Sequence, residues 1–164
     1  MDTKFGFEDI KRKLVAMRRE TLVLLANQAQ NYFVKSFKNQ GFNGEPWKEV
    51  KRRDPDENAY KYPKTKGLQR QTSPILIGAG FKKRGGTLRM AVATMARTAE
   101  IGSGTLRMVV DLPYAAIQNE GGEGLAFGKH SFTMKKRQFI GQTTELTQMQ
   151  MKKLDEIVTR IFKR

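Results

Sequence analysis

Residues 8–39 read EDIKRKLVAMRRETLVLLANQAQNYFVKSFKN, and the arrangement of the rest of the chain depends on this stretch. Its apolar residues recur at steps of three or four, which is typical of one face of a helix. The apolar stripe consists of Ile10, Leu14, Met17, Thr21 or Leu22, Leu25, Ala29, Phe33 and Phe37. Glu8 and Asp9 lie where the helix dipole favours acids, and Gly41 is a suitable stop. We therefore predict a helix over residues 1–39, long enough to reach a neighbouring subunit.

Residues 40–74 form a polar stretch without clear periodicity, and we predict an extended loop. Trp47, Tyr60 and Tyr62 alternate there with basic residues. These basic residues are Lys48, Lys51, Arg52, Arg53, Lys61, Lys64 and Lys66. In one interpretation the loop becomes ordered on a partner, whose bases or acidic groups meet the arginines and the rings. In the other, Trp47 anchors the loop on the core while the lysines face water.

The middle of the chain shows the alternation that is typical of strands. The segments TLRMAVATM (87–95) and TLRMVVDL (105–112) place polar and apolar residues in turn, with a period of two. Gly102–Gly104 lies between residues 98–101 and residues 105–111, where a tight turn is expected. We predict an antiparallel sheet that contains this hairpin.

Proline and glycine divide the region that follows. Pro113 favours the first turn of a short helix, which the pair Gly121–Gly122 ends. The glycine-rich segment 121–128 is predicted to be a mobile loop, and residues 130–136 are predicted to be a strand. Residues 75–141 as a whole are therefore expected to be sheet and loops.

The chain closes with a second amphipathic segment, residues 142–164. Thr143 or Thr144 can cap its N-terminus, and Glu145 lies in its first turn. Its apolar stripe consists of Leu146, Met149, Leu154, Ile157, Val158, Ile161 and Phe162. The predicted fold class is α+β: a single domain, 1–164, with a long N-terminal helix and a C-terminal helix packed on a small antiparallel sheet, and a long polar loop.

Composition narrows the classes of function. The chain carries 31 Lys+Arg against 16 Asp+Glu, a net charge of +15, which favours polyanions or acidic protein faces as partners. A solvated cationic surface is the simpler alternative. Cysteine is absent, and no apolar run is long enough for a transmembrane helix. The charged start, MDTKFGFEDIKRK, leads us to expect no signal peptide and assembly in the cytoplasm.

A catalytic or metal site is not expected. His130 is the single histidine, and no Gly-x-Ser-x-Gly sequence frames a serine. Asp54, Asp56 and Glu57 are the nearest approach to a metal site, but they lack the glycine and distal glutamate of a calcium loop. We therefore predict no enzyme activity and no cofactor.

Two groups of basic residues are candidates for contact with polyanions. GAGFKKRGG (78–86) places three cations between glycines but lacks the Gly-Lys-Ser/Thr ending of a triphosphate-binding loop. Its backbone amides and side chains can still hold a nucleic-acid phosphate, and a solvated turn is the alternative. The candidates are Lys48, Lys51, Arg52 and Arg53 in the polar loop, and Lys82, Lys83 and Arg84 here.

Several blocks, taken in chain order, carry a resemblance to a known family. They are Gly44-Glu45-Pro46-Trp47, Pro74–Gly80, Tyr114-Ala115-Ala116-Ile117-Gln118-Asn119-Glu120-Gly121-Gly122 and Arg137-Gln138-Phe139-Ile140-Gly141. With the long first helix and the last helix, they resemble the virion-morphogenesis (tail-completion) family of tailed bacteriophages, as found in Mu-like and P2-like phages and prophages. The last two blocks are the most specific part of the resemblance.

The resemblance implies a structural protein of the virion neck or tail. It implies a role in tail completion or head–tail joining, as a subunit of a homo-oligomeric neck ring such as a hexamer, with other neck and tail proteins as partners and possible non-specific contact with DNA. The alternative function is a nucleic-acid-binding protein without sequence specificity. The residues that the family motifs assign to the fold or to an interface are Trp47, Tyr114, Ala115, Asn119, Gly121, Gly122, Arg137, Phe139 and Gly141.

The chain departs from the family pattern in places. Gln118 stands where the family commonly has a histidine. The segment that leads into the Arg137–Gly141 block commonly contains a proline in the family, and here it reads Met134-Lys135-Lys136-Arg137-Gln138. A histidine that is lost while function remains is not catalytic, which suits a structural role. Packing alone also explains both blocks. On that reading the core contains Tyr114, Ile117, Phe139 and Ile140, and the turns contain Gly121, Gly122 and Gly141.

Overall fold

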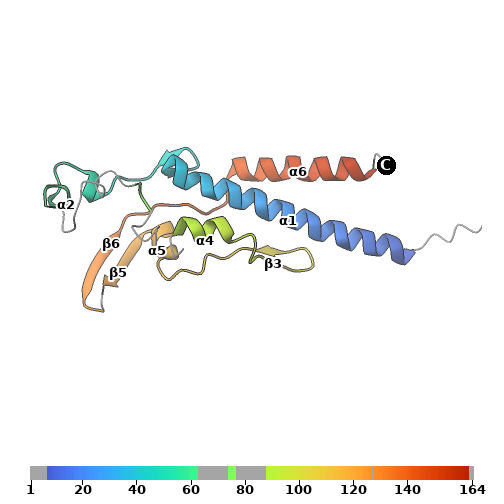
Figure 1. Cartoon of the computed structure of the whole chain (residues 1–164), viewed down its shortest axis with the longest axis horizontal. Coiled ribbons are helices and arrows are strands. Elements are labelled where there is room, and N and C mark those ends of the chain that lie inside the picture. Colours follow the sequence, from blue (N-terminus) through green and yellow to red (C-terminus); the bar gives the residue numbers. More distant parts are fainter. Residues whose placement is uncertain (1–6, 63–73, 77–87, 127, 163–164) are drawn as a thin grey trace, which may run out of the picture.

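The computed structural model describes residues 7–62, 74–76, 88–126 and 128–162 (Figure 1). The predicted α+β class is confirmed. The helices are α1 (Phe7–Asn39), α2 (Asn58–Lys61), α4 (Leu88–Thr94), α5 (Ala115–Glu120) and α6 (Thr144–Phe162), with a 3-10 turn at Lys51–Arg53. The strands are β1 (Gly41–Phe42), β2 (Glu45–Pro46), β3 (Glu100–Ile101), β4 (Leu106–Arg107), β5 (Gly122–Ala126) and β6 (His130–Met134).

Helix α1 ends at the predicted residue, Asn39, and residues 1–6 of the predicted helix lie outside the described residues, but a different residue turns the chain at its end. Gln40 adopts a left-handed φ of 53°, and the helix stops at Asn39. Gly41 instead serves the β1–β2 hairpin, because a Cβ atom there would collide with the backbone oxygen of Glu45. The side chain of Gln40 holds the turn in place, because its Nε2 atom donates to the Phe37 carbonyl at 2.6 Å.

The core lies along the second half of α1. Ala29, Phe33 and Phe37 of the predicted stripe are buried there, together with Ala26 and Tyr32. Helices α4 and α6 both pack against α1. Because the apolar side chains come from helices far apart in sequence, their burial ties the two ends of the chain to its middle.

The predicted strand at 87–95 is wrong, because residues Leu88–Thr94 form helix α4. Leu88, Val92 and Met95 are spaced by four and three residues, so one helix face carries all of them, and all are almost fully buried. The segment fits a period of two as well, and Leu, Met, Ala and Arg favour helices. Packing against α1 decides between the two patterns.

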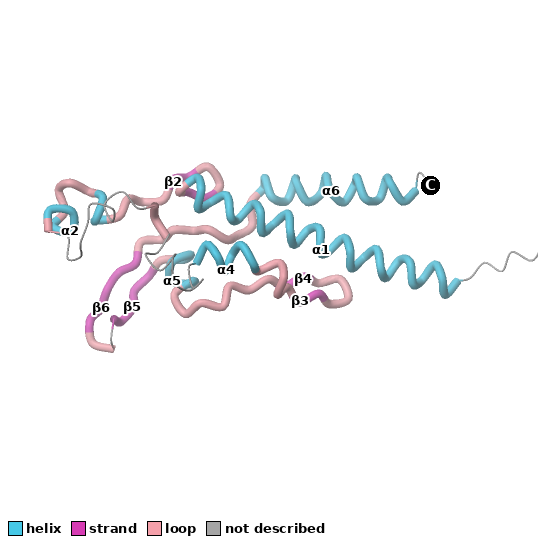
Figure 2. Tube along the Cα trace, viewed as in Figure 1, coloured by secondary structure: helices cyan, strands magenta, loops and turns pink. Residues whose placement is uncertain are grey.

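The hairpin around Gly102–Gly104 is confirmed but is short. Glu100 pairs with Arg107 and Ile101 with Leu106, and the predicted strand over 105–112 stops after two paired residues. Within the described residues the strands form three two-stranded sheets, each a hairpin between neighbouring strands. The small sheets therefore lie around the helices as separate ribbons (Figure 2).

The loop predicted at 121–128 is wrong over most of its length. Residues Gly122–Ala126 form β5, which pairs with β6 over five residue pairs from Gly122↔Met134 to Ala126↔His130. Strand β6 (His130–Met134) confirms a strand here, and it ends two residues before the predicted boundary at 136. Phe132 lies opposite Gly124, and its ring covers the space that a side chain on Gly124 would need. The glycine that suggested a loop is therefore part of the packing of the ribbon.

The two predicted shorter helical segments are confirmed. Helix α5 follows Pro113, and its end at Gly121 is capped by the Gly121 amide, which donates to the Ile117 carbonyl at 2.9 Å. Helix α6 begins after Thr143, whose hydroxyl accepts the Leu146 amide at 3.1 Å. Thr143 is therefore the capping residue of the two that the sequence offered.

Figure 1 shows α1 and α6 extending to one side of the molecule and the β5–β6 ribbon to the other. Among the helices of the described residues, none is both long and apolar enough to cross a membrane.

Candidate functional site

Trp47 anchors the start of the polar loop on the core. Its ring is 8% exposed and meets Phe37 edge to face, at 5.6 Å between ring centroids. The indole N–H donates to the Gln138 carbonyl at 2.6 Å, and the backbone N–H donates to the Gln40 carbonyl at 2.8 Å. The anchoring interpretation of Trp47 is therefore the one that the structure supports.

Arg137 is buried beneath the same loop. Its side chain donates to two backbone carbonyls, from Nε to Lys48 at 3.2 Å and from Nη2 to Glu49 at 3.5 Å. Its backbone N–H donates to the Gln118 carbonyl of α5 at 2.9 Å. Burial lowers the pKa of the guanidinium group from its ordinary value, and the Glu49 carboxylate offsets part of that effect. Arg137 stays charged at neutral pH, because an arginine pKa begins far above it.

Asn119 of α5 holds the segment that follows Arg137. Its Oδ1 atom accepts two backbone N–H groups at 3.0 Å, those of Phe139 and Ile140. This fixes Phe139, which is almost fully buried and lies 5.6 Å from the Phe37 ring. One amide side chain thus links α5, the segment before α6 and the core.

Glycine is needed at Gly121 for two reasons. Its φ is +75°, and a Cβ atom would lie 2.8 Å from the Lys136 backbone nitrogen. At Gly141 a Cβ atom would collide with the Gln138 side chain. Gly122 has a φ of +124° with open space around it and begins β5, so it is a strand residue rather than the expected turn residue.

The remaining two residues of the Tyr-Ala block behave differently from each other. Ala115 is buried, and its N–H donates to the Leu112 carbonyl at 2.9 Å. Tyr114 is 41% exposed, so its expected place in the core is wrong. Tyr114 lies before the first turn of α5, whereas the core-facing positions of this short helix begin with Ala115. Ile117 and Ile140 are half-buried.

We call the set formed by Trp47, Asn119, Arg137 and Phe139 the motif junction. Its hydrogen bonds connect the loop after β2, helix α5 and the segment 135–141 that runs from β6 to α6. The polar groups of the junction bind atoms of the same chain, mainly backbone carbonyl and N–H groups. Its arrangement can position segments, and it contains no nucleophile paired with a base.

The predicted basic loop is partly engaged with its own chain. Lys51 pairs with Glu57 at 3.4 Å, Arg53 pairs with Glu49 at 3.5 Å, and Arg52 Nη2 donates to the Pro74 carbonyl at 3.1 Å. Exposed pairs of this kind stabilise little, about 0–1 kcal/mol each. The Lys48 side chain is exposed. Lys82, Lys83 and Arg84 lie outside the described residues.

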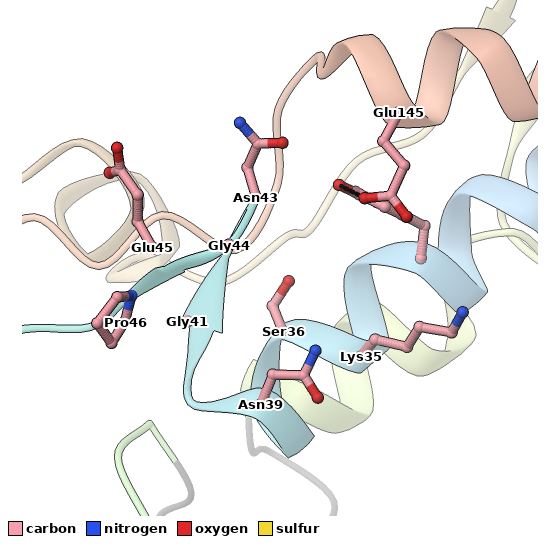
Figure 3. Close-up of a pocket in the computed structure, with 10 residues that line it drawn as sticks. Lys35, Ser36, Asn39, Gly41, Asn43, Gly44, Glu45, Pro46 and Glu145 are labelled. Atoms are coloured by element: carbon pink, nitrogen blue, oxygen red, sulfur yellow. Dashed lines mark hydrogen bonds between the residues drawn. The ribbon is translucent and has the colours of Figure 1, made fainter.

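A pocket of about 490 Å³ lies between the end of α1, the β1–β2 hairpin and the start of α6 (Figure 3). It is lined by Tyr32, Lys35, Ser36, Asn39, Gly41, Asn43, Gly44, Glu45, Pro46 and Glu145. Tyr32 donates to Glu145 Oε2 at 3.1 Å and accepts from the Thr143 hydroxyl at 3.1 Å. The lining mixes one cation, two carboxylates and two side-chain amides, so the pocket is polar. Sequence reasoning missed this pocket because its residues come from three separate segments.

The residues considered for catalysis or metal binding do not converge. His130 is exposed at the start of β6, opposite Ala126. In the part of the chain that the structure describes, no three His, Asp or Glu side chains are close enough together to hold a metal ion.

Comparison with protein-family models, with curated proteins and with solved structures finds no match to this chain.

Proposed function

We propose that this chain is a non-enzymatic structural protein of a tailed-phage particle, which acts in tail completion or head–tail joining as one subunit of a neck ring. The observation that carries the proposal is the motif junction. The two sequence blocks that most resemble the family, Tyr114–Gly122 and Arg137–Gly141, lie side by side and bind each other through Asn119 and Arg137. Residues with this role are needed for a shape and not for a reaction.

The extended form of the molecule also supports an assembly role. Helix α1 exposes Val15, Val23 and Leu24, and α6 exposes Met151 and Val158. Large apolar side chains that project from long helices are suited to burial against neighbouring proteins. The proposed location is the virion neck or tail, and the proposed partners are copies of this chain and other neck or tail proteins.

The proposal is tested by deleting the gene from a phage that encodes this chain. We expect full heads and separate tails to accumulate, and the purified protein to restore joining when it is added to the mixed extract. Native mass spectrometry of the purified chain should show a closed oligomer. Intact, head-joined particles from the deletion strain would contradict the proposal.

The net charge of +15 favours a second candidate, a nucleic-acid-binding protein without sequence specificity. Its affinity for DNA should fall with salt, with a log–log slope of about −0.9 for each neutralised phosphate. Lys51→Ala tests one such contact. If Lys51 gives up its ion pair with Glu57 and binds a phosphate, the variant should reduce the magnitude of the slope by about 0.9. Failure to bind duplex DNA at low salt would eliminate this candidate.

A further inference from the structure

The β5–β6 ribbon is the longest strand pairing in the described residues, and it projects from the helical body (Figure 2). Among the described strands, β5 and β6 pair with each other and with no other strand. Each strand therefore has an outer edge where backbone N–H and C=O groups face away from its partner. Such edges are ready templates for pairing with another strand.

The two edges carry opposite charge at the same level of the ribbon. Glu120 ends α5 two residues before β5, Glu123 is the second residue of β5, and Lys135 and Lys136 directly follow β6. All of these side chains are exposed. Because Gly122 pairs with Met134, the start of β5 and the end of β6 lie at the base of the ribbon together.

One face of the ribbon also carries a large apolar side chain that is exposed to water. The alternation of strand side chains places Glu123 and Leu125 on one face, opposite Thr133 and Ser131. Leu125 is 66% exposed there. The other face carries Phe132, which covers Gly124. A further strand beside β5 would give Leu125 a cross-strand neighbour and reduce its exposure to water.

From these observations we infer that the ribbons of neighbouring copies join edge to edge, with β5 of one copy pairing antiparallel with β6 of the next. This deepens the proposed neck-ring function and rests on it. A rotation about a ring axis keeps every ribbon at the same level, so Glu120 and Glu123 of one copy meet Lys135 and Lys136 of its neighbour. Because β5 and β6 run in opposite directions within a copy, the contact between copies is antiparallel.

Charge distinguishes a second copy from other occupants of these edges. A polyanion complements the lysines that follow β6 and is repelled by the glutamates of β5. A parallel two-fold pairing of β5 with β5 places Glu123 beside Glu123 of the other copy, which is destabilising between strands. An antiparallel two-fold pairing puts the glutamates at opposite ends of the contact and leaves them without lysine partners. A head-to-tail contact matches both strands at once, and such contacts form a ring when the rotation between copies closes.

The absence of cysteine allows a direct test by disulfide trapping. Glu123→Cys and Lys135→Cys variants are purified separately, mixed and oxidised under mild conditions, and the same is done with Glu123→Cys and Thr133→Cys. We expect the mixed dimer of at least one combination to exceed both homodimers, because a disulfide needs Cβ atoms about 3.8 Å apart. The double variant Glu123→Cys/Thr133→Cys is the folding control, since these residues pair within one copy. It should form an internal disulfide.

Charge reversal supplies an independent readout. Glu123→Lys and Lys135→Glu should each weaken self-association about tenfold, measured by sedimentation, since attraction between strands becomes repulsion. The combined variant Glu123→Lys/Lys135→Glu should regain most of the lost affinity. Glu100→Lys on β3 is the matched control for a change of the same size, because Glu100 is exposed and lies outside the ribbon and outside the exposed apolar residues of α1 and α6; it should leave association within about twofold.

The outcomes separate the ribbon contact from the function that it refines. No mixed disulfide in any combination, or homodimers in a purely statistical ratio, overturns the edge contact. If rings form but no mixed disulfide is found, the neck-ring function stands and the ribbons are not the contact between copies. A mixed disulfide in a protein that fails to restore head–tail joining keeps the edge contact and removes the proposed function.

Discussion

Arg137 is buried with its guanidinium group directed at the backbone of the polar loop, where Lys48 and Glu49 offer carbonyl oxygens. Both hydrogen bonds are part-buried and come from a charged donor, and such bonds contribute about 1.5–3 kcal/mol. Arg137 therefore links the segment after β6 to the polar loop, 88 residues away in the sequence.

Arg137→Ala should lower the free energy of unfolding by about 2–4 kcal/mol, because it removes these donors and the packing of the side chain. Urea denaturation is the measurement. The matched control is Arg107→Ala, whose pair with Glu100 is exposed at both ends and should contribute less than about 1 kcal/mol. Equal effects of the two substitutions would contradict the role assigned to Arg137.

Gly121 presents a conformational requirement at the same scale. Gly121→Ala should destabilise the protein by about 2–4 kcal/mol for two reasons: the new Cβ atom clashes with the Lys136 backbone, and the positive φ is unfavourable for alanine. Gly128→Ala separates the two causes, because Gly128 has a φ of +68° with nothing within 4 Å. Its cost should stay near 1 kcal/mol in the same denaturation experiment.

At the scale of elements, the start of α6 depends on one side chain that serves two partners. The Thr143 hydroxyl accepts the Leu146 N–H and donates to the Tyr32 hydroxyl, so the helix cap is also a contact with α1. Gln28 of α1 adds a second link by donating to the Met149 carbonyl at 3.1 Å. These polar contacts set the point on α1 where α6 begins.

Thr143→Ala should therefore cost about 1–2 kcal/mol of stability, measured by thermal or urea unfolding. Thr144→Ala is the control, because Thr144 is the exposed neighbour in the first turn of α6. Its effect should stay within about 0.5 kcal/mol. Thr143→Ser keeps the hydroxyl and should recover most of the loss, and a large effect of Thr144→Ala would contradict the assignment of the cap.

At the scale of the whole molecule, the first half of α1 and the β5–β6 ribbon are at opposite ends (Figure 1). The core occupies the second half of α1, so exposed residues nearer its start contribute little to folding and are available to partners. The ring proposal thus needs two contacts that are independent of each other, one at the ribbon edges and one on the helices.

Leu24→Ser tests the helix contact. Leu24 is 42% exposed, so the substitution should lower the free energy of unfolding by only about 1 kcal/mol and still weaken assembly into the oligomer. Phe33→Ser is the contrasting variant: Phe33 is buried in the core, and its loss should reduce stability by about 3–5 kcal/mol. Unchanged assembly of Leu24→Ser would show that this part of α1 is not a contact surface.

The sequence alone determined the two long helices, and it left Trp47 open between contact with a partner and anchoring on the core, which the structure decided for the anchor. Helical periodicity is local, so α1 and α6 are predictable within a few residues from their apolar stripes and caps. The sequence also marked Asn119, Arg137 and Phe139 as motif residues, because they stand in blocks whose order resembles that of the family. Their partners were not predictable, since the side chains of the junction bind backbone groups 20 to 91 residues away.

Only the tertiary structure decided the identity of α4 and β5. The pattern of 87–95 fits a strand and a helix equally, and the choice depends on the apolar surface of α1 that Leu88 and Val92 bury. Glycine at 122 and 124 predicts a loop until β6 supplies a paired backbone and the Phe132 ring. In both places the local sequence leaves two conformations close in free energy, and contacts with distant residues select one of them.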